Sequence, residues 1–234
     1  MLEGSKDITF TDTVVTVNAA VKAENDTYTV PSYVKNIAGS AFAGTSLKHI
    51  HFSEGVQEIG GNAFYKSSLE NVEIPSSVTK IGSYAFAYTA LVEADLSGAE
   101  EIGDFAFMKE TLTPFKVILS ENIKSLGDNP FANCIVAPFS TIVTEDFLGT
   151  EYSKVVYTFD INDNIKIIDG SIYRVVPKGL ELIAWMGTDI AVVADDTVRI
   201  SAMAFAGQDV RQVVLPYTVA AIGHKAFYDC NKLL

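Results

Sequence analysis

The sequence predicts an α/β repeat solenoid, that is, a right-handed superhelix of short stacked coils, mostly β-structure with short helical turns, together with a small antiparallel β insert. Three observations lead to this fold class. A motif containing an Ala-Phe pair recurs along the chain, and apolar residues stand at fixed distances on both sides of its phenylalanine. The 234 residues are also 48% hydrophobic, which is enough to bury a substantial core.

The phenylalanine of this motif recurs at nearly constant spacing. Successive steps in the first block are 22, 22, 21 and 24 residues, and the fifth copy carries proline instead of alanine before its phenylalanine. An aliphatic residue stands five positions before each phenylalanine. A sustained period of this length is typical of a solenoid, in which each unit buries its apolar edge only against its neighbours. The copies are centred on Phe42, Phe64, Phe86, Phe107, Phe131, Phe205 and Phe227.

One unit, SLENVEIPSSVTKIGSYAFAYT, illustrates the strand of each repeat. Leu69, Val72 and Ile74 follow the pattern L-x-x-L-x-L, and the last two alternate with polar residues as in a strand with one buried face. Pro75 ends the strand because proline cannot donate to a continuing ladder. Equivalent strands of successive units are expected to pair in parallel, about 4.8 Å apart.

The rest of the unit leads the chain to the next strand. Val78 and Ile81 are expected to point inward, and Gly82 suits a tight turn where a side chain would crowd the next coil. The SYAFAY segment is predicted to form a single helical turn that places Ala85 and Phe86 in the core.

These residues carry a family resemblance. The order of strand, proline, sVtxIGxxAF and a small residue before the next leucine resembles the BspA-like leucine-rich repeat, over roughly residues 30–136 and 192–234. The resemblance implies a leucine-rich-repeat solenoid in a bacterial surface-type protein. Such proteins are typically exported or displayed on the cell surface, and several are linked to adhesion. An extracellular or cell-surface location is therefore what the resemblance implies for this chain.

We expect four segments within one continuous solenoid domain. They are an N-terminal strand-rich cap (1–29), a leucine-rich repeat block (30–136), a β-hairpin insert (137–191) and a second repeat block (192–234). Turn signals at Asp169-Gly170 and Pro177-Lys178-Gly179 predict two or three antiparallel strands in the insert. The second block stops where another strand would begin. The chain is therefore expected to be a fragment, or to end in an open edge that associates end to end with another chain.

Charge and hydropathy argue against several classes of partner. The formal net charge is −12, and an acidic surface repels phosphate backbones and anionic lipids, which argues against nucleic-acid and membrane-surface partners. No apolar run approaches the roughly 18 residues of a membrane helix, so we expect no membrane insertion. The start, MLEGSKDITFTDTVV, lacks the apolar core of a secretory signal peptide. Either the protein stays inside the cell, or the sequence is that of a mature or trimmed chain.

The polar residues between the inward positions predict the exposed face of the sheet. In register, His51, Glu73 and Asp95 would form one column. A second column would stand two residues earlier on each strand, and Lys116 would be the counterpart of Asp95 on the next copy. Leucine-rich repeats most often use this surface for partners. The candidate binding residues are His49, His51, Glu70, Asn71, Glu73, Glu93, Asp95 and Lys116.

Three interpretations of this face remain open. It is a solvated acidic surface that keeps the sheet soluble, a contact surface for a protein or glycan ligand, or a metal site. The metal site would use His49, His51, Glu73 and Asp95. Zinc accepts such ligands, but flat strands rarely bring them close enough together, so we assign no metal ligand.

The sequence contains no motif that predicts catalysis. It lacks a G-x-G-x-x-G, a phosphate-binding loop, a G-x-S-x-G and an H-E-x-x-H, and it has only three histidines. Carboxylates on an open sheet face lack the cleft that would raise one of their pKa values for glycoside hydrolysis. We therefore expect neither an enzyme nor a cofactor.

Two other features have structural explanations. Asp160–Asn164, with the sequence DINDN, resembles the opening of a calcium loop but lacks its glycine and its final glutamate, which favours a polar turn. Cys134 and Cys230 hold equivalent positions in repeats that are several coils apart, too far for a disulfide. Both are expected to be free, buried thiols.

The function that these observations favour is a non-catalytic binding module. It would act in adhesion to, or recognition of, a host or neighbouring-cell protein or glycan through the exposed strand face. The alternative is a structural role, in which the repeats form a rigid spacer or a self-assembling stalk within a longer surface protein.

Overall fold

The structure is a computed structural model that describes residues 8–11, 14–17, 26–111, 113–136, 141–147, 150–156, 159–160, 162–187 and 189–234. The chain divides into two compact units, Met1–Ile135 and Val136–Leu234. This division falls beside the predicted boundary between the first repeat block and the insert. The expectation that the four segments form one continuous solenoid domain stays a prediction.

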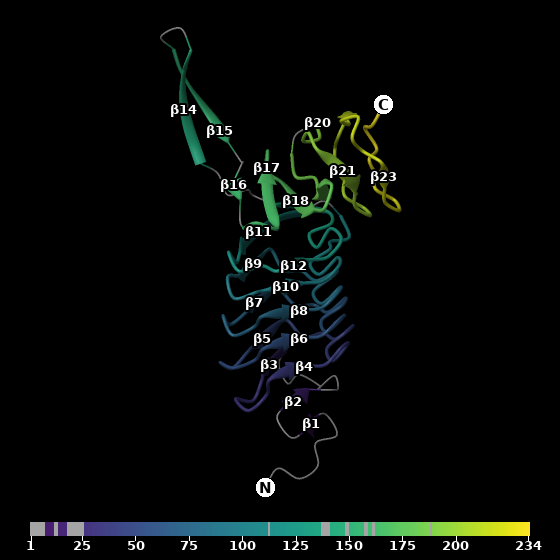
Figure 1. The fold of residues 1–234 in the computed structure, drawn as a ribbon. Coiled ribbons are helices and arrows are strands. Elements are labelled where there is room, and N and C mark those ends of the chain that lie inside the picture. Colours follow the sequence, from purple (N-terminus) through teal and green to yellow (C-terminus); the bar gives the residue numbers. More distant parts are fainter. Residues whose placement is uncertain are drawn as a thin grey trace. The chain divides into compact units, whose positions relative to one another are not determined.

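The first unit is a stack of coils, drawn from purple to teal in Figure 1, that contribute strands to two sides. One side carries a seven-stranded sheet in the order β1-β2-β4-β6-β8-β10-β12, in which β1 and β2 pair antiparallel and the later neighbours pair in parallel. Its strands are β1 (Ile8–Thr11), β2 (Val14–Val17), β4 (Asn36–Ile37), β6 (Glu58–Ile59), β8 (Lys80–Ile81), β10 (Glu101–Ile102) and β12 (Ser125–Leu126).

The other side carries two three-stranded sheets. One has the order β3-β5-β7 and the other β13-β11-β9. Their strands are β3 (Thr27–Thr29), β5 (His49–His51), β7 (Asn71–Glu73), β9 (Glu93–Leu96), β11 (Thr113–Leu119) and β13 (Cys134–Val136). The predicted N-terminal cap, 1–29, therefore contains β1, β2 and β3, and its role as a cap stays a prediction.

The phenylalanine column forms the centre of the first unit. Phe42, Phe64 and Phe86 are fully buried, and neighbouring rings stack with centroids 5.0–5.1 Å apart and planes within 4° of parallel. The stack continues through Phe107 to Phe131, at 5.1 and 5.7 Å. Burying each side chain stabilises the fold by about 1.5–3 kcal/mol, and each ring pair adds about 0.5–1.5 kcal/mol. The sequence spacing therefore predicted the core correctly.

The predicted helical turns are wrong. The described residues contain no α-helix, and the Ala-Phe segments are successive tight turns. The residue two positions before each repeat phenylalanine has a positive φ, for example 57° at both Asn62 and Tyr84. In most copies the residue two positions after it also has a positive φ, for example 55° at Lys66. A right-handed helix cannot pass through residues in the left-handed region.

Hydrogen bonding explains why the chain takes this path. Alternate amides point along the stack, as when Phe64 N donates to Ala85 O at 2.7 Å and Lys66 N to Ala87 O at 2.9 Å. The amides between them close local turns, as when Tyr65 N donates to Asn62 O. In a helix, all these amides would donate to carbonyls of their own segment. Here half of them donate to the next coil instead.

Gly82 is required by close packing, but against the previous coil rather than the next one. A Cβ added at Gly82 would lie 2.4 Å from the backbone nitrogen of Gly61. Gly60 and Gly103 meet the backbone of the coil before them in the same way, at 2.6 and 2.4 Å. The glycine column therefore sets how closely successive coils approach.

The second unit combines antiparallel strands with two further coils. A six-stranded sheet has the order β16-β17-β18-β19-β21-β23, antiparallel as far as β19 and parallel beyond it. Separate pairs are β14 with β15, antiparallel, and β20 with β22, parallel. The strands are β14 (Thr141–Phe147), β15 (Thr150–Val156), β16 (Phe159–Asp160), β17 (Ile165–Ile168), β18 (Ser171–Val176), β19 (Gly179–Ala184), β20 (Ile190–Val192), β21 (Thr197–Ile200), β22 (Gln212–Val214) and β23 (Ala221–Ile222).

Both predicted turns of the insert are present. Asp169 and Gly170 join β17 to β18 with φ of 48° and 80°, as a two-residue hairpin turn requires. Gly179 follows the second turn and begins β19. Within the DINDN segment, the Asn162 side chain accepts hydrogen bonds from the amides of Asn164 and Ile165, which is a polar turn.

Trp185 extends the aromatic column of the second unit, which the sequence pattern did not reveal. Its ring stacks on Phe205 at 5.6 Å, and Phe205 stacks on Phe227 at 4.8 Å. Trp185 N donates to Ala204 O, as Phe205 N donates to Ala226 O. Tryptophan therefore takes the place of a repeat phenylalanine, without the Ala-Phe signature. Cys134 and Cys230 are both free, the first buried and the second half-buried.

Candidate functional site

The outward side of the short strands in the first unit carries the predicted residues. In β5 and β7 the central residues, Ile50 and Val72, point inward, so that their neighbours on each strand point away from the core. His51 and Glu73 are exposed, and His49 is half-buried. The alternation follows from the two-residue period of a strand.

The register of these strands agrees with the predicted columns. In the parallel pairing of β5 and β7, His49 lies opposite Asn71 and His51 opposite Glu73. Thr27 of β3 lies opposite His49, which extends the column by one strand.

The register of β11 corrects one position. Lys116 lies opposite Glu93, and Ile118 lies opposite Asp95, whereas the sequence placed Lys116 opposite Asp95. The repeat from Phe107 to Phe131 has 24 residues, two more than the regular unit. The two extra residues lie before the paired part of β11, so the strand slips by two positions and keeps the same face outward.

Two adjoining hollows occupy this face. The first has a volume of about 410 Å³ and contains His49, His51, Glu70 and Asn71, and the second, of about 330 Å³, contains Asp95 and Lys116. Val72, Glu73 and Glu93 line both. All eight predicted residues therefore lie along one continuous surface, which we call the strand face.

The strand face mixes charge with exposed apolar groups. Lys48 pairs with Glu70 at 3.3 Å, and Lys116 pairs with Glu93 at 3.7 Å. Such exposed pairs contribute only about 0–1 kcal/mol each. Ile118, 41% exposed, lines the second hollow beside Asp95. The strand face therefore presents both paired charges and an exposed apolar side chain.

Within the described residues, neither a metal-binding cluster nor a membrane-spanning helix is present. Among them, no group of three or more His, Cys, Asp or Glu side chains could hold a metal ion. Within the same ranges, no helix has the length and apolar character that a membrane span needs.

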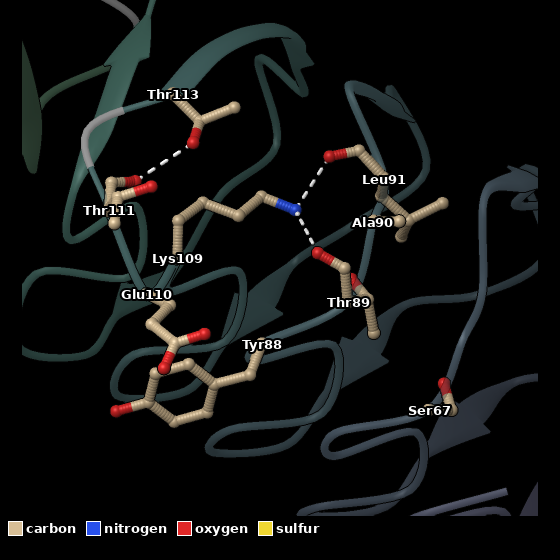
Figure 2. Close-up of a pocket in the computed structure, with 9 residues that line it drawn as sticks. All are labelled: Ser67, Tyr88, Thr89, Ala90, Leu91, Lys109, Glu110, Thr111 and Thr113. Carbon is tan, nitrogen blue, oxygen red and sulfur yellow. Dashed lines mark hydrogen bonds between the residues drawn. The ribbon is translucent and has the colours of Figure 1, made fainter.

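A third hollow, which sequence reasoning missed, lies outside the strand face (Figure 2). Its volume is about 340 Å³. Lys109, only 4% exposed, donates from its ammonium to the carbonyls of Thr89 at 3.0 Å and Leu91 at 2.6 Å. The ammonium also lies 5.1 Å from the centre of the Phe115 ring. Burial lowers the pKa of Lys109 to about 8, because the charged form loses its hydration.

Comparison with known families identifies the repeat. The BspA type leucine rich repeat region matches residues 7–137 and 192–234 in six copies, which is more than half of the chain. The chain belongs to the BspA-type leucine-rich repeat family. The second matched range is the predicted second block, 192–234, whereas the first begins at residue 7 and so includes most of the segment predicted as a cap, 1–29. BspA-type repeats are typical of binding or recognition modules and not of catalytic domains.

Solved structures support the same fold. The pneumococcal vaccine antigen PcpA is similar with a TM-score of 0.61 and 20% identity, over 97% of this chain and 57% of that one. A leucine-rich repeat protein from Eubacterium ventriosum is similar with a TM-score of 0.53 and 16% identity, over 89% of this chain and 52% of that one. This BspA-type chain thus spans little more than half the length of these two proteins. No curated protein sequence matches it.

Proposed function

We propose that the chain is a non-catalytic recognition module whose strand face binds a partner protein or glycan. The observation that carries this proposal is the continuity of the strand face. Residues from five strands, β3, β5, β7, β9 and β11, line two hollows that share Val72, Glu73 and Glu93. No such continuous polar surface is needed to build the core, since the inward residues already do that.

The chemistry of the strand face favours a protein partner with basic contact residues. Glu73 and Asp95 are exposed carboxylates outside the two ion pairs on this face. Ile118, 41% exposed, adds apolar contact area in the hollow that contains Asp95. Opposite charge would steer the partner to the face, and the apolar side chain would supply contact once it is bound.

A location at the cell surface or outside the cell belongs to the same proposal, together with a role in adhesion. It is supported by membership of the BspA-type family and by the likeness in fold to a pneumococcal vaccine antigen. A recognition module in that place meets host or neighbouring-cell molecules directly.

A binding screen with matched variants tests the proposal. The natural chain is compared with a Glu73→Lys, Glu93→Lys, Asp95→Lys variant against a panel of matrix proteins and glycans. A control variant, Glu54→Lys, Asp163→Lys, Asp195→Lys, makes the same change in net charge at exposed carboxylates that line neither hollow of the strand face. Binding that the first variant loses and the control keeps is the expected result.

Two other results would count against it. Equal binding by all three proteins would place the contact elsewhere on the chain. Absence of binding by the natural chain would favour the spacer or stalk, and a molecular mass in solution that rises with protein concentration would then support end-to-end assembly.

A further inference from the structure

The third hollow lies at a repeat that departs from the regular coil. Six of the seven residues that stand two positions after a repeat phenylalanine have a positive φ, among them Lys66 and Tyr88. Lys109 is the exception. The chain leaves the turn pattern at this point, within the repeat that carries two extra residues.

Near this departure, two carbonyls of the preceding coil accept hydrogen bonds from a side chain. In regular coils Thr45 O accepts from Ser68 N, and Leu69 O accepts from Ala90 N. The equivalent carbonyls, on Thr89 and Leu91, accept hydrogen bonds from the ammonium of Lys109. The lysine side chain thus bonds to the preceding coil at positions where a backbone amide does so in other coils, and Lys109 lines the hollow.

The groups around this hollow suit a polar, uncharged ligand. Lys109 contributes a positive charge and the exposed Glu110 a negative one, so the wall is close to neutral overall. Two N–H bonds of the ammonium go to carbonyls, which leaves the third for an oxygen of a ligand. Glu110 can accept from hydroxyl groups.

Two further features point to a ligand. The half-buried Tyr88 ring lines the hollow. The Lys66 ammonium lies over this ring at 5.5 Å and the Tyr65 ring lies 5.5 Å from it at 83°, so the C–H face of a sugar ring can pack only on the remaining surface of Tyr88. Ser67, 4% exposed, also lines the hollow, and its hydroxyl is buried without a hydrogen-bond partner. A buried polar group without a partner is uncommon in a folded protein.

We propose that this hollow is a binding site for one neutral sugar ring of a glycan, separate from the strand face. Its volume of about 340 Å³ lies at the small end of the range of about 300–1,000 Å³ for ligand sites, as a single ring requires. Tyr88 packs against the ring, and Glu110 and Lys109 bind its hydroxyl groups.

Saturation-transfer NMR tests this site with defined probes. The natural chain is mixed in turn with millimolar methyl glycosides of glucose, galactose, mannose and N-acetylglucosamine, and with N-acetylneuraminic acid as a charged comparison. We expect saturation of the ring protons of at least one neutral glycoside. Tyr88→Ala and Glu110→Gln should each weaken binding about tenfold, and Glu54→Gln should leave it unchanged.

Glu110 is exposed, so Glu110→Gln tests the site even if Tyr88→Ala fails to fold. Three results would overturn the proposal: no transfer to any neutral glycoside, transfer that both variants retain, or transfer to N-acetylneuraminic acid alone. The strand-face variant should keep sugar binding, which separates this site from the proposed protein contact.

Discussion

The Glu181 carboxylate accepts two hydrogen bonds from the guanidinium of Arg174 through one oxygen, at 3.1 Å from Nε and 2.8 Å from the second nitrogen. Its other oxygen accepts from Ser201 at 2.8 Å and lies 3.1 Å from Arg199. The Glu181 side chain is only 5% exposed. A buried carboxylate that is fully hydrogen-bonded in this way fixes β19 between its neighbours β18 and β21.

Replacing Glu181 by alanine should therefore destabilise the protein by about 3 kcal/mol, because two guanidinium groups and a buried hydroxyl lose their acceptor. Urea unfolding measures the effect. The matched control is Asp189→Ala, which removes the exposed partner of Arg211 and should cost less than about 1 kcal/mol. If both variants lost the same free energy of unfolding, burial of the Glu181 carboxylate would not explain its contribution to stability.

Truncating the central ring of the aromatic stack should be more costly. Phe86→Ala removes contacts with both Phe64 and Phe107 and leaves a cavity at a fully buried position. It should lower the free energy of unfolding by about 3–5 kcal/mol. Phe86→Leu keeps most of the volume and should lose clearly less. The free energy of unfolding of each variant checks this order, and a Phe86→Ala protein as stable as the natural one would refute the stack as the core.

The glycine column predicts a difference between two glycines. Gly82→Ala should destabilise the first unit by about 1–3 kcal/mol, because its Cβ meets the backbone of Gly61. Gly44 has φ of +67° but open space around it, so Gly44→Asn, whose side chain tolerates this conformation, should be nearly neutral. Thermal unfolding of both variants gives the comparison. A neutral Gly82→Ala would mean that the coils can separate locally.

Lys109 predicts a pH dependence of stability. Its pKa is about 8 in the folded chain, below its ordinary value of 10.5, so between these values the unfolded chain binds more protons than the folded one. The contribution of Lys109 to stability should therefore be smallest below pH 8 and rise towards pH 10.5. Urea unfolding at pH 7 and pH 10 measures this. The free energy of unfolding of the natural chain minus that of Lys109→Met should be larger at pH 10 than at pH 7. A difference that stays constant would show that the charged amine is not penalised by burial.

Much of the fold could be predicted from the spacing of a few residue types. Phe42, Phe64 and Phe86 stand one repeat apart, and apolar side chains at a fixed period have to stack because no single coil can bury them. The outward positions of β5 and β7 followed from the two-residue period of strands, which is why the members of the strand face could be named in advance. Whether that face binds a partner stays a prediction.

Other features depended on contacts that local pattern does not specify. The positive φ at Tyr84 and its equivalents comes from amides that bond to the next coil, and a local preference for a helical turn cannot show that competition. The two-residue slip that sets Lys116 opposite Glu93 was decided by pairing between strands. The Glu181 network joins residues of neighbouring strands, and the Lys109 hollow is lined by residues from three successive repeats. The sequence alone thus determined the repeat and its buried column, because the residues that must be buried recur at a fixed spacing along the chain. Only the tertiary structure decided the turns, the register and the hollows, because these depend on which backbone groups meet across coils.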